Sequence, residues 1–342
     1  MTHPPGIDQR VTDFARRRFG DGARVAPLPG DASDRRFFRL KTPGLTSLIL
    51  MVHAEPFEVE SLPFFLHARF LHEIGAAVPQ IVASYPADGI LVVQDLGDET
   101  LQTHLEHCDD SRRRFLYLQA VQMIASLQRD GTGALTPDLP AATTALDAPK
   151  LLWELHFFGK HYVEGLLGSP LETAQSEELM RWFEALAKEV AAYPSVLCHR
   201  DYHARNLMVK GDQLFMVDFQ DARRGPHTYD LASLLRDSYV RLPEDLVDEM
   251  LRFYREASQE AGTEAAFRRA FARTCLQRNI KAVGTFASQA MLRGNRSYLR
   301  YIPATLDSVR ARLDELRDDA ETGPIRALFE GPLAFAGEAA SA

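Results

Sequence analysis

The 342-residue sequence predicts an α+β fold in which a small, mostly antiparallel sheet precedes a large helical region. Five short apolar runs, separated by turn residues, lie within the first 95 residues. One helical segment, roughly Glu60 to Ile74, interrupts them. Beyond residue 96 most apolar residues recur at helical spacing. We therefore expect two lobes, residues 1–95 and residues 96–342.

The five predicted strands cover residues 24–28, 35–40, 47–52, 81–85 and 90–94, and a short amphipathic helix over residues 8–19 precedes them. Later helices are predicted at 100–106, 111–129, 150–167, 175–192, 243–256, 264–284 and 302–316, with another starting near Thr228. In the helix 111–129 the expected buried stripe is Phe115, Leu118, Val121, Ile124 and Leu127. Residues 131–144 are expected to form a loop, and the tail from Asp318 is expected to pack loosely.

Composition narrows the class of protein. A net charge of −8 argues against wholesale binding to a nucleic-acid backbone. Three cysteines, Cys108, Cys198 and Cys275, lie far apart without metal-ligand spacing, which favours a reducing cytoplasm. The N-terminus lacks the apolar core of a signal peptide, and no apolar run approaches membrane-spanning length, so no membrane association is expected.

The stretch from Leu197 to Phe219 carries the most specific pattern. His199-Arg200-Asp201 follows an apolar run, and Asn206 comes after four further residues. Two strand-like runs, 207–209 and 214–217, then flank a Gly-Asp turn and predict a hairpin that ends at Asp218-Phe219. This H-R-D-x-x-x-x-N and D-F spacing is typical of the catalytic loop and metal-binding strand end of a kinase.

The chemistry of phosphoryl transfer explains these residue types. A carboxylate must orient an attacking hydroxyl and accept its proton, and Asp201 fits that role. Asn206 and Asp218 supply the hard oxygen ligands that magnesium prefers. Asp230, in the first turn of the following helix, can brace the catalytic-loop backbone or can be an ordinary acid at a helix start.

Two segments of the sheet lobe are candidates for nucleotide binding. The turn Gly30-Asp31-Ala32-Ser33 is small enough for backbone amides to approach phosphates, although a plain hairpin explains it equally well. Gln94-Asp95-Leu96 follows the last strand, where backbone groups can pair with adenine. Met51 stands where kinases place a phosphate-binding lysine, and Arg35, Arg36 and Arg39 are the nearest replacement cations.

The acceptor is expected to be a small molecule, because no long activation segment follows Asp218. The candidate acceptor-binding side chains are Glu154, Arg205, Asp221, Arg223 and Arg278. For Glu154 the structural alternative is the solvated face of its helix, and for the arginines it is a surface ion pair.

The chain resembles the aminoglycoside phosphotransferase (APH) and choline-kinase-like family of small-molecule kinases. The matching blocks are GDASDRRFFRL (30–40), LVVQDLGDETL (91–101), HRDYHARNLMV (199–209), VDFQDARRGPHTYDLASLLRD (217–237) and QRNIKAVGTFA (277–287). The resemblance implies a protein-kinase-like two-lobed fold, with Asp201 as base and Asn206 and Asp218 as magnesium ligands. It also implies that residues 30–33 cover the phosphates and residues 94–96 surround adenine.

The blocks narrow the resemblance to the sugar-kinase branch. That branch implies ATP and Mg²⁺ as cofactors, and transfer to the anomeric hydroxyl of N-acetylmuramate or N-acetylglucosamine during peptidoglycan sugar recycling. We expect a cytoplasmic monomer whose partner is this small sugar. Two alternatives stay open: phosphorylation of an aminoglycoside or another amino-alcohol, and a nucleotide-binding regulator without turnover. A cationic acceptor would need a site lined by carboxylates, so the charge of the site separates the first alternative from the main hypothesis.

Overall fold

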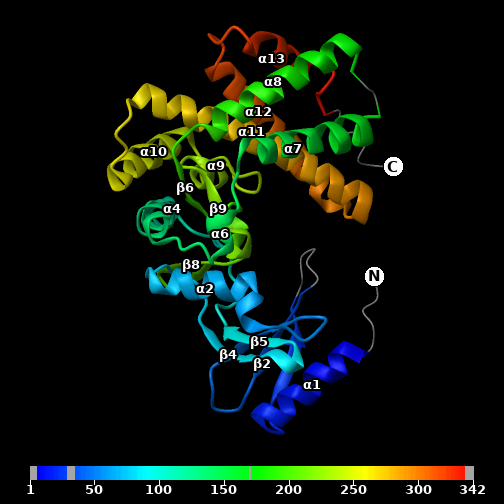
Figure 1. Ribbon diagram of the computed structural model, residues 1–342, viewed down its shortest axis with the longest axis vertical. Helices are drawn as coiled ribbons and strands as arrows, with labels where there is room; N and C mark the ends of the chain where they lie inside the picture. Colours follow the sequence, from blue (N-terminus) through cyan, green and yellow to red (C-terminus); the bar gives the residue numbers. More distant parts are fainter. Residues whose placement is uncertain (1–5, 29–34, 169–170, 336–342) are drawn as a thin grey trace. The chain divides into compact units, whose positions relative to one another are not determined.

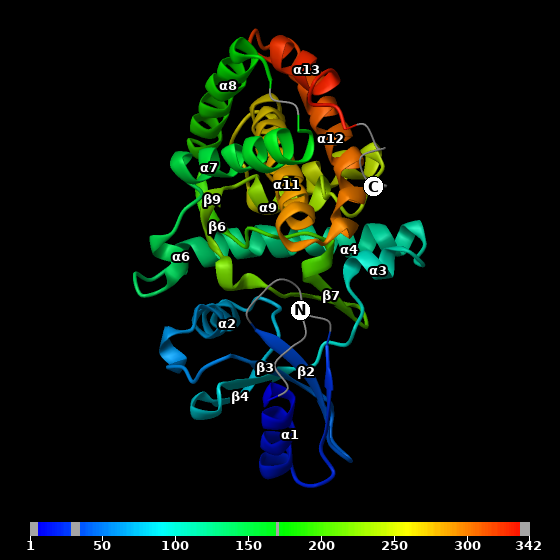
Figure 2. The ribbon, with the colours of Figure 1, turned by 90° about the vertical axis from the view of Figure 1, so that its right-hand side faces the viewer.

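The computed structural model describes residues 6–28, 35–168 and 171–335. The chain forms two compact units (Figures 1 and 2). The first consists of Met1–Glu99 and Met208–Gln220, and the second of Thr100–Leu207 and Asp221–Ala342. The division into a nucleotide-binding lobe of residues 1–95 and a helical lobe of residues 96–342, which carries the catalytic loop and the acceptor site, stays a prediction.

The first unit contains the predicted five-stranded antiparallel sheet, in the order β1-β2-β3-β5-β4. Its strands are β1 (Arg24–Pro27), β2 (Arg36–Lys41), β3 (Leu48–Val52), β4 (Ile81–Tyr85) and β5 (Ile90–Gln94). The predicted hairpin is also present, as β7 (Leu207–Lys210) and β8 (Gln213–Met216). The predicted α+β class is confirmed.

Helix α1 (Gly6–Phe19) covers one face of the sheet, as its apolar spacing predicts. Val11, Phe14 and Ala15 pack there with alternate strand residues, which are Phe38, Leu40, Leu50, Val52, Ile90 and Val92. Because side chains alternate along a strand, Ile49, Met51, Leu91 and Val93 belong to the opposite face. Helix α2 (Pro63–Glu73) begins with a proline in its first turn, a position where the missing N–H costs no hydrogen bond.

The second unit is mainly helical. Its long helices are α4 (Asp110–Ser126), α7 (Ala148–Phe158), α8 (Thr173–Ala191), α10 (Glu244–Ser258), α11 (Glu264–Arg293) and α12 (Ile302–Glu315), and α9 (Tyr229–Leu235) is shorter. Helix α11 contacts α7, α8, α9 and α12 (Figures 1 and 2). Its middle is buried on all sides, so it forms the centre of this unit.

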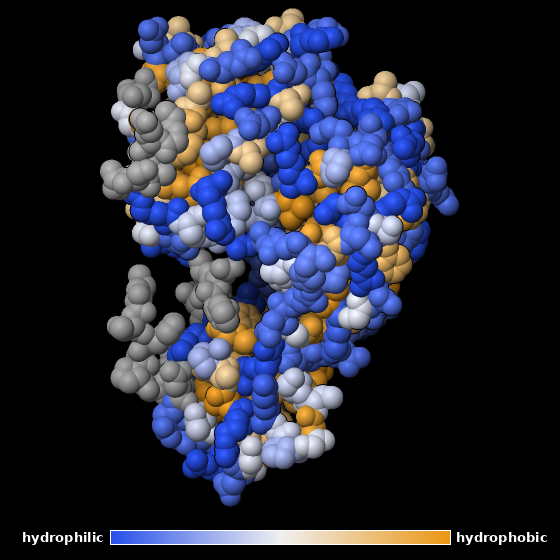
Figure 3. Space-filling model, turned by 180° about the vertical axis from the view of Figure 1, so that it is seen from behind, coloured by the Kyte–Doolittle hydropathy of each residue, from blue (hydrophilic) through white to orange (hydrophobic). Residues whose placement is uncertain are grey.

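Smaller elements complete the second unit. They are α3 (Leu101–Leu105), α5 (Thr132–Ala134), α6 (Pro140–Thr143), α13 (Thr322–Glu330), β6 (Ser195–Cys198) and β9 (Arg223–Pro226). Strand β6 pairs with β9 in an antiparallel ladder. Polar side chains cover most of the face drawn in Figure 3. No helix in the described ranges is both long and apolar enough to cross a bilayer.

Three predictions about the helical region were wrong, the first of them only in part. The predicted stripe of the helix 111–129 is confirmed at Val121, Ile124 and Leu127, which are buried, but Phe115 is exposed and Leu118 is half-buried. The other buried residues of α4 include Leu116, Tyr117 and Ala120. Residues 131–144 contain α5 and α6 and bury Leu139 and Ala141. Residues 318–335, the described part of the tail, are not loosely packed: α13 places Ile325, Leu328 and Phe329 in the core at the spacing of one helix face.

Helices α7 and α11 approach each other closely at Gly284. A Cβ atom at this position would lie 2.7 Å from the Cα of Phe158 and 2.8 Å from its backbone nitrogen. These are backbone atoms and cannot rotate away. Glycine therefore sets the distance between the two helices.

We predict that Gly284→Ala destabilises the protein by about 1–3 kcal/mol, because α7 and α11 must move apart to admit the methyl group. Thermal or urea unfolding measures this change. Gly133→Ala is the matched control, since a Cβ at Gly133 meets nothing within 4 Å. Equal stabilities for the two variants would contradict this description of the α7–α11 contact.

Candidate active site

A buried carboxylate fixes the start of the predicted catalytic loop. Asp230, in the first turn of α9, accepts hydrogen bonds from the backbone N–H groups of His199 (2.7 Å) and Arg200 (2.9 Å). Asp230 is fully buried. Arg200 has φ of 83°, a left-handed conformation that is uncommon for a residue with a side chain. The bracing role predicted for Asp230 is therefore present in the structure, and it stabilises a strained turn.

The rest of the loop is held by equally specific contacts. The hydroxyl of Tyr202 donates to the carbonyl of Ala120 at 2.9 Å. Asp237 accepts from the backbone N–H of Ala204 at 2.9 Å. The side-chain amide of Asn206 donates to the carbonyl of Asp201 at 2.9 Å. The loop is thus tied to α4, to the end of α9 and to itself.

Asp201 lies among cations and keeps contact with solvent. Its carboxylate is 3.3 Å from Nζ of Lys281 on α11 and 4.0 Å from Nε of Arg200, and its side chain is 28 % exposed. Burial by itself raises the pKa of Asp201, but the charges of Lys281 and Arg200 outweigh burial and hold it well below its usual range. The carboxylate is therefore ionised at neutral pH and can accept a hydrogen bond from a hydroxyl.

Arg200 links Asp201 to two further acids. It lies 3.7 Å from Glu154 on α7 and 3.4 Å from Asp221. Glu154 is almost fully buried, 3.7 Å from Nζ of Lys150, and accepts from the amide of Gln277 at 3.2 Å. Its alternative assignment to a solvated helix face was wrong, because these partners enclose it.

The remaining predicted acceptor residues differ in their surroundings. Arg223, on β9, pairs with Asp221 at 3.5 Å, and Asp221 is 54 % exposed. Arg205 donates to Gln102 at 3.1 Å, and its guanidinium stacks 4.6 Å from the ring centre of Tyr239.

Arg278 is buried and donates to the hydroxyl of Ser233, which in turn lies 3.5 Å from the carbonyl of Arg200. These contacts place Arg278 behind the catalytic loop. In the described part of the second unit, four cations, namely Lys150, Arg200, Arg223 and Lys281, and three acids, namely Glu154, Asp201 and Asp221, form one connected group. We call this group the charged cluster.

The first unit holds Asp218 in a constrained backbone. Its φ is 65°, and one carboxylate oxygen accepts from the amide of Gln220 at 2.7 Å. Phe219 stacks on Phe64 of α2 with ring centres 4.9 Å apart. The packing of Phe219 on Phe64 fixes the strand end on one side. The left-handed backbone of Asp218 is of the kind that gathers at functional sites.

The predicted adenine segment is partly committed to internal contacts. The carboxylate of Asp95 accepts from Arg39 at 2.7 and 3.1 Å, and Arg39 also bonds Asp98 at 2.8 Å. The carbonyl of Asp95 accepts from Lys210 at 2.9 Å. Leu96 is buried, and the backbone N–H of Gln94 bonds Gln80. The nucleotide-binding role of residues 94–96 stays a prediction.

Met51 is a buried side chain on the sheet face opposite α1. Of the three replacement cations, Arg39 is paired with two carboxylates, and Arg36 lies over the ring of Phe38. Nη1 of Arg35 is 4.0 Å from Sδ of Met51. Which of these cations replaces the lysine stays a prediction. Gly30, Asp31, Ala32 and Ser33 lie outside the described residues.

The residues predicted to hold magnesium fit such an ion chemically. Because Nδ2 of Asn206 donates to the carbonyl of Asp201, its Oδ1 is the atom left to act as a ligand. Asp218 offers a carboxylate, and both are hard oxygen donors. When bound, magnesium would neutralise charge on a triphosphate.

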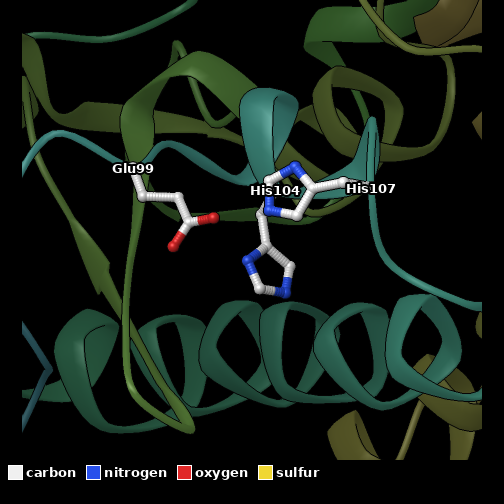
Figure 4. A group of neighbouring side chains, drawn as sticks. All are labelled: Glu99, His104 and His107. Atoms are coloured by element: carbon white, nitrogen blue, oxygen red, sulfur yellow. The ribbon is translucent and has the colours of Figure 1, made fainter.

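Two histidines near the start of the second unit form a separate small group. His104, in α3, and His107, in the following turn, have ring centres 5.3 Å apart (Figure 4). Figure 4 also draws Glu99, which ends the first of the two segments that make up the first unit. Two imidazoles are fewer than the three or four protein ligands of a zinc site, and neither histidine belongs to the charged cluster.

Sequence reasoning missed two members of the charged cluster. Lys281 occurs in the block 277–287 and was not predicted to touch Asp201, which is 80 positions earlier. Lys150 precedes the predicted acceptor residue Glu154 by one helical turn, and that spacing is a signal that would have found it.

Comparison with known proteins gives the family. The model of the phosphotransferase enzyme family (APH) matches residues 24–270. The chain is 33 % identical to the N-acetylmuramate/N-acetylglucosamine kinase of Pseudomonas aeruginosa over 310 residues, which cover 87 % of each protein. It is 31 % identical to the protein of the same name from Pseudomonas putida, over 92 % of this chain and 93 % of that one. The chain belongs to the phosphotransferase enzyme family, as predicted.

A solved structure agrees on the fold. The crystal structure of choline kinase from Cryptosporidium parvum superposes with a TM-score of 0.63 and covers 94 % of this chain and 99 % of that chain, at 11 % sequence identity. The predicted protein-kinase-like fold is therefore confirmed.

We predict that Asp230→Asn lowers stability by about 1–3 kcal/mol and also lowers kcat. An amide has one acceptor oxygen, so one of the two backbone N–H groups loses its partner. Thermal unfolding and steady-state kinetics measure the two effects. Asp318→Asn, at an exposed position, is the control. A stable Asp230→Asn variant with normal turnover would show that the loop does not need this carboxylate.

Proposed function

We propose that the protein transfers the γ-phosphoryl group of ATP to the anomeric hydroxyl of an N-acetylated amino sugar, N-acetylmuramate or N-acetylglucosamine. The names of the relatives support this acceptor, since they cover most of the chain at 31–33 % identity. The observation that carries the proposal is the braced, ionised Asp201 next to cations on α11 and in its own loop. Such a reaction would serve the recycling of cell-wall sugars.

In this proposal Asp201 accepts a hydrogen bond from the sugar hydroxyl and takes its proton. The sugar oxygen forms a bond to the γ-phosphorus as the bond between that phosphorus and the β,γ-bridging oxygen breaks, and ADP leaves with the electron pair. A carboxylate with a low pKa suits a late proton transfer, because the transition state is loose and the hydroxyl needs mainly orientation. An anomeric hydroxyl is also more acidic than an ordinary alcohol, which reduces the demand on the base.

Asn206 and Asp218 are the proposed magnesium ligands, and the first unit is the proposed nucleotide-binding part, through residues 30–33 and 94–96. Arg278 and Arg205 are proposed to support the loop more than to touch the acceptor, because Arg278 is buried behind the loop and Arg205 stacks on Tyr239. Arg223 and Asp221, at the solvent side of the charged cluster, keep their proposed acceptor role.

The charge of the cluster separates the proposed acceptor from the aminoglycoside alternative. Glu154 is enclosed by Lys150, Arg200 and Gln277, and Asp201 is assigned to the reacting hydroxyl. The carboxylate left for a cationic acceptor is Asp221, which already pairs with two arginines. With four cations against three acids, each acid already paired or assigned to the reacting hydroxyl, the cluster favours a neutral or anionic sugar over a polycation. Intact Asp201, Asn206 and Asp218 likewise disfavour a regulator without turnover.

We predict that the purified protein converts ATP to ADP only when Mg²⁺ and an N-acetylated amino sugar are both present, and that Asp201→Asn reduces kcat about 10³-fold or more. A coupled ADP assay over a panel of amino sugars, aminoglycosides and choline measures this. Turnover with an aminoglycoside or choline and none with the sugars would refute the proposal. Normal rates for Asp201→Asn would refute the role of this residue.

We predict that Lys281→Met lowers kcat about tenfold to a hundredfold, because the ammonium group is the cation nearest to the base and helps to fix its orientation. Lys281→Arg should restore part of the rate, since it keeps the charge. Lys188→Met, an exposed lysine on α8, is the control. Unchanged kcat in Lys281→Met would mean that the Lys281–Asp201 ion pair has no part in the reaction.

A further inference from the structure

Helix α7 presents an exposed indole beside the charged cluster. Trp153 is 55 % exposed, although it is the largest apolar side chain, and its ring centre is 5.5 Å from that of Phe157. Tryptophan is enriched at binding interfaces, because its indole combines a large apolar face with an N–H donor. The other tryptophan of the chain, Trp182, is buried in the core of the second unit. Trp153 has no packing role of that kind.

Lys150 joins this indole to the proposed catalytic residues. Its Nζ lies 4.1 Å from the ring centre of Trp153 and 3.7 Å from the carboxylate of Glu154. Glu154 is in turn 3.7 Å from Arg200, the residue preceding the proposed base. A continuous path of contacts therefore runs from Trp153 to Asp201 within the second unit.

The electrostatic surroundings of Lys150 show that it faces the same site. Burial lowers the pKa of Lys150, and the charges of Arg200, Arg223 and Lys281 lower it further, whereas Glu154 opposes them. An ammonium group repelled by three cations and paired with one shared acid is well placed to take another anion. Its side chain is 27 % exposed, so a ligand can reach it.

We propose that Lys150 and Trp153 form an acceptor subsite that selects an amino sugar bearing a carboxylate. The ammonium group of Lys150 pairs with the carboxylate, and the indole packs against the apolar C–H face of the pyranose ring. This inference rests on the proposed function and deepens it. N-acetylmuramate carries both features, whereas N-acetylglucosamine has the ring without the carboxylate, so the acidic sugar is the preferred acceptor.

The binding part of this inference has a direct optical readout. Trp153 is exposed and Trp182 is 4 % exposed, so a sugar added without nucleotide should change the fluorescence of Trp153. We expect a saturable change with N-acetylmuramate in the wild-type protein and its loss in Trp153→Phe. An equal change in Trp153→Phe, or no change in the wild type at concentrations that saturate turnover, would overturn the role of the indole.

Selectivity tests the role of Lys150. In Lys150→Met the ratio of kcat/KM for N-acetylmuramate to that for N-acetylglucosamine should fall about tenfold or more, because only the acidic sugar loses an ionic partner. Lys150→Arg should retain part of the preference. The ratio is the decisive quantity, since any general effect of the variant on Glu154 or Arg200 acts on both sugars. Lys160→Met, an exposed lysine in the segment that follows α7, should leave the ratio unchanged.

The outcomes distinguish this inference from the proposed function. If the wild type phosphorylates both sugars and Lys150→Met slows both equally, the carboxylate subsite is wrong and the kinase assignment stands. If the wild type phosphorylates neither sugar, the proposed function fails and the subsite fails with it.

Discussion

The hydrogen bonds from two backbone N–H groups to the carboxylate of Asp230 are the interaction on which the rest of the site depends. Arg200 adopts a left-handed backbone, and such a conformation persists only where the surroundings determine it. Asp230 does so from the first turn of α9, with both of its oxygens engaged. The direction of Asp201, the next residue, follows from this constraint. The His199-Arg200-Asp201 motif therefore depends for its geometry on Asp230, about thirty positions later in the chain.

Helix α11 provides the second constraint. It is thirty residues long and buried along its middle. Its Lys281 reaches Asp201 in the loop, its Arg278 reaches Ser233 behind the loop, and its Gln277 reaches Glu154 on α7. Gly284 allows α7 to pack closely against it, and α7 carries Lys150, Trp153 and Glu154. The separation of two helices therefore sets how the base, its cations and the exposed indole are spaced. The contact between Gly284 and Phe158 in the core therefore affects the positions of the charged and aromatic side chains on α7.

Much of this arrangement could be predicted from the sequence because it is encoded locally. Alternating strands, the Gly-Asp hairpin and the loop motif depend on neighbours within about twenty residues, and the structure contains each of them. The contact of Lys281 with Asp201 joins residues 80 positions apart, and periodicity says nothing about such a pair. The burial of Glu154 was missed for the same reason, since its partners Arg200 and Gln277 come from distant segments. The tail helix α13 was missed because its apolar face is short and lies in an Ala- and Gly-rich context.

In the proposed reaction Asp201 directs an anomeric hydroxyl, and not another hydroxyl of the sugar, toward the phosphoryl group. Phosphorus NMR of the purified product tests this most directly. We expect a phosphate resonance coupled to the anomeric proton of the sugar, and loss of the reducing end. A resonance coupled instead to the protons at carbon 6, with the reducing end intact, would contradict it.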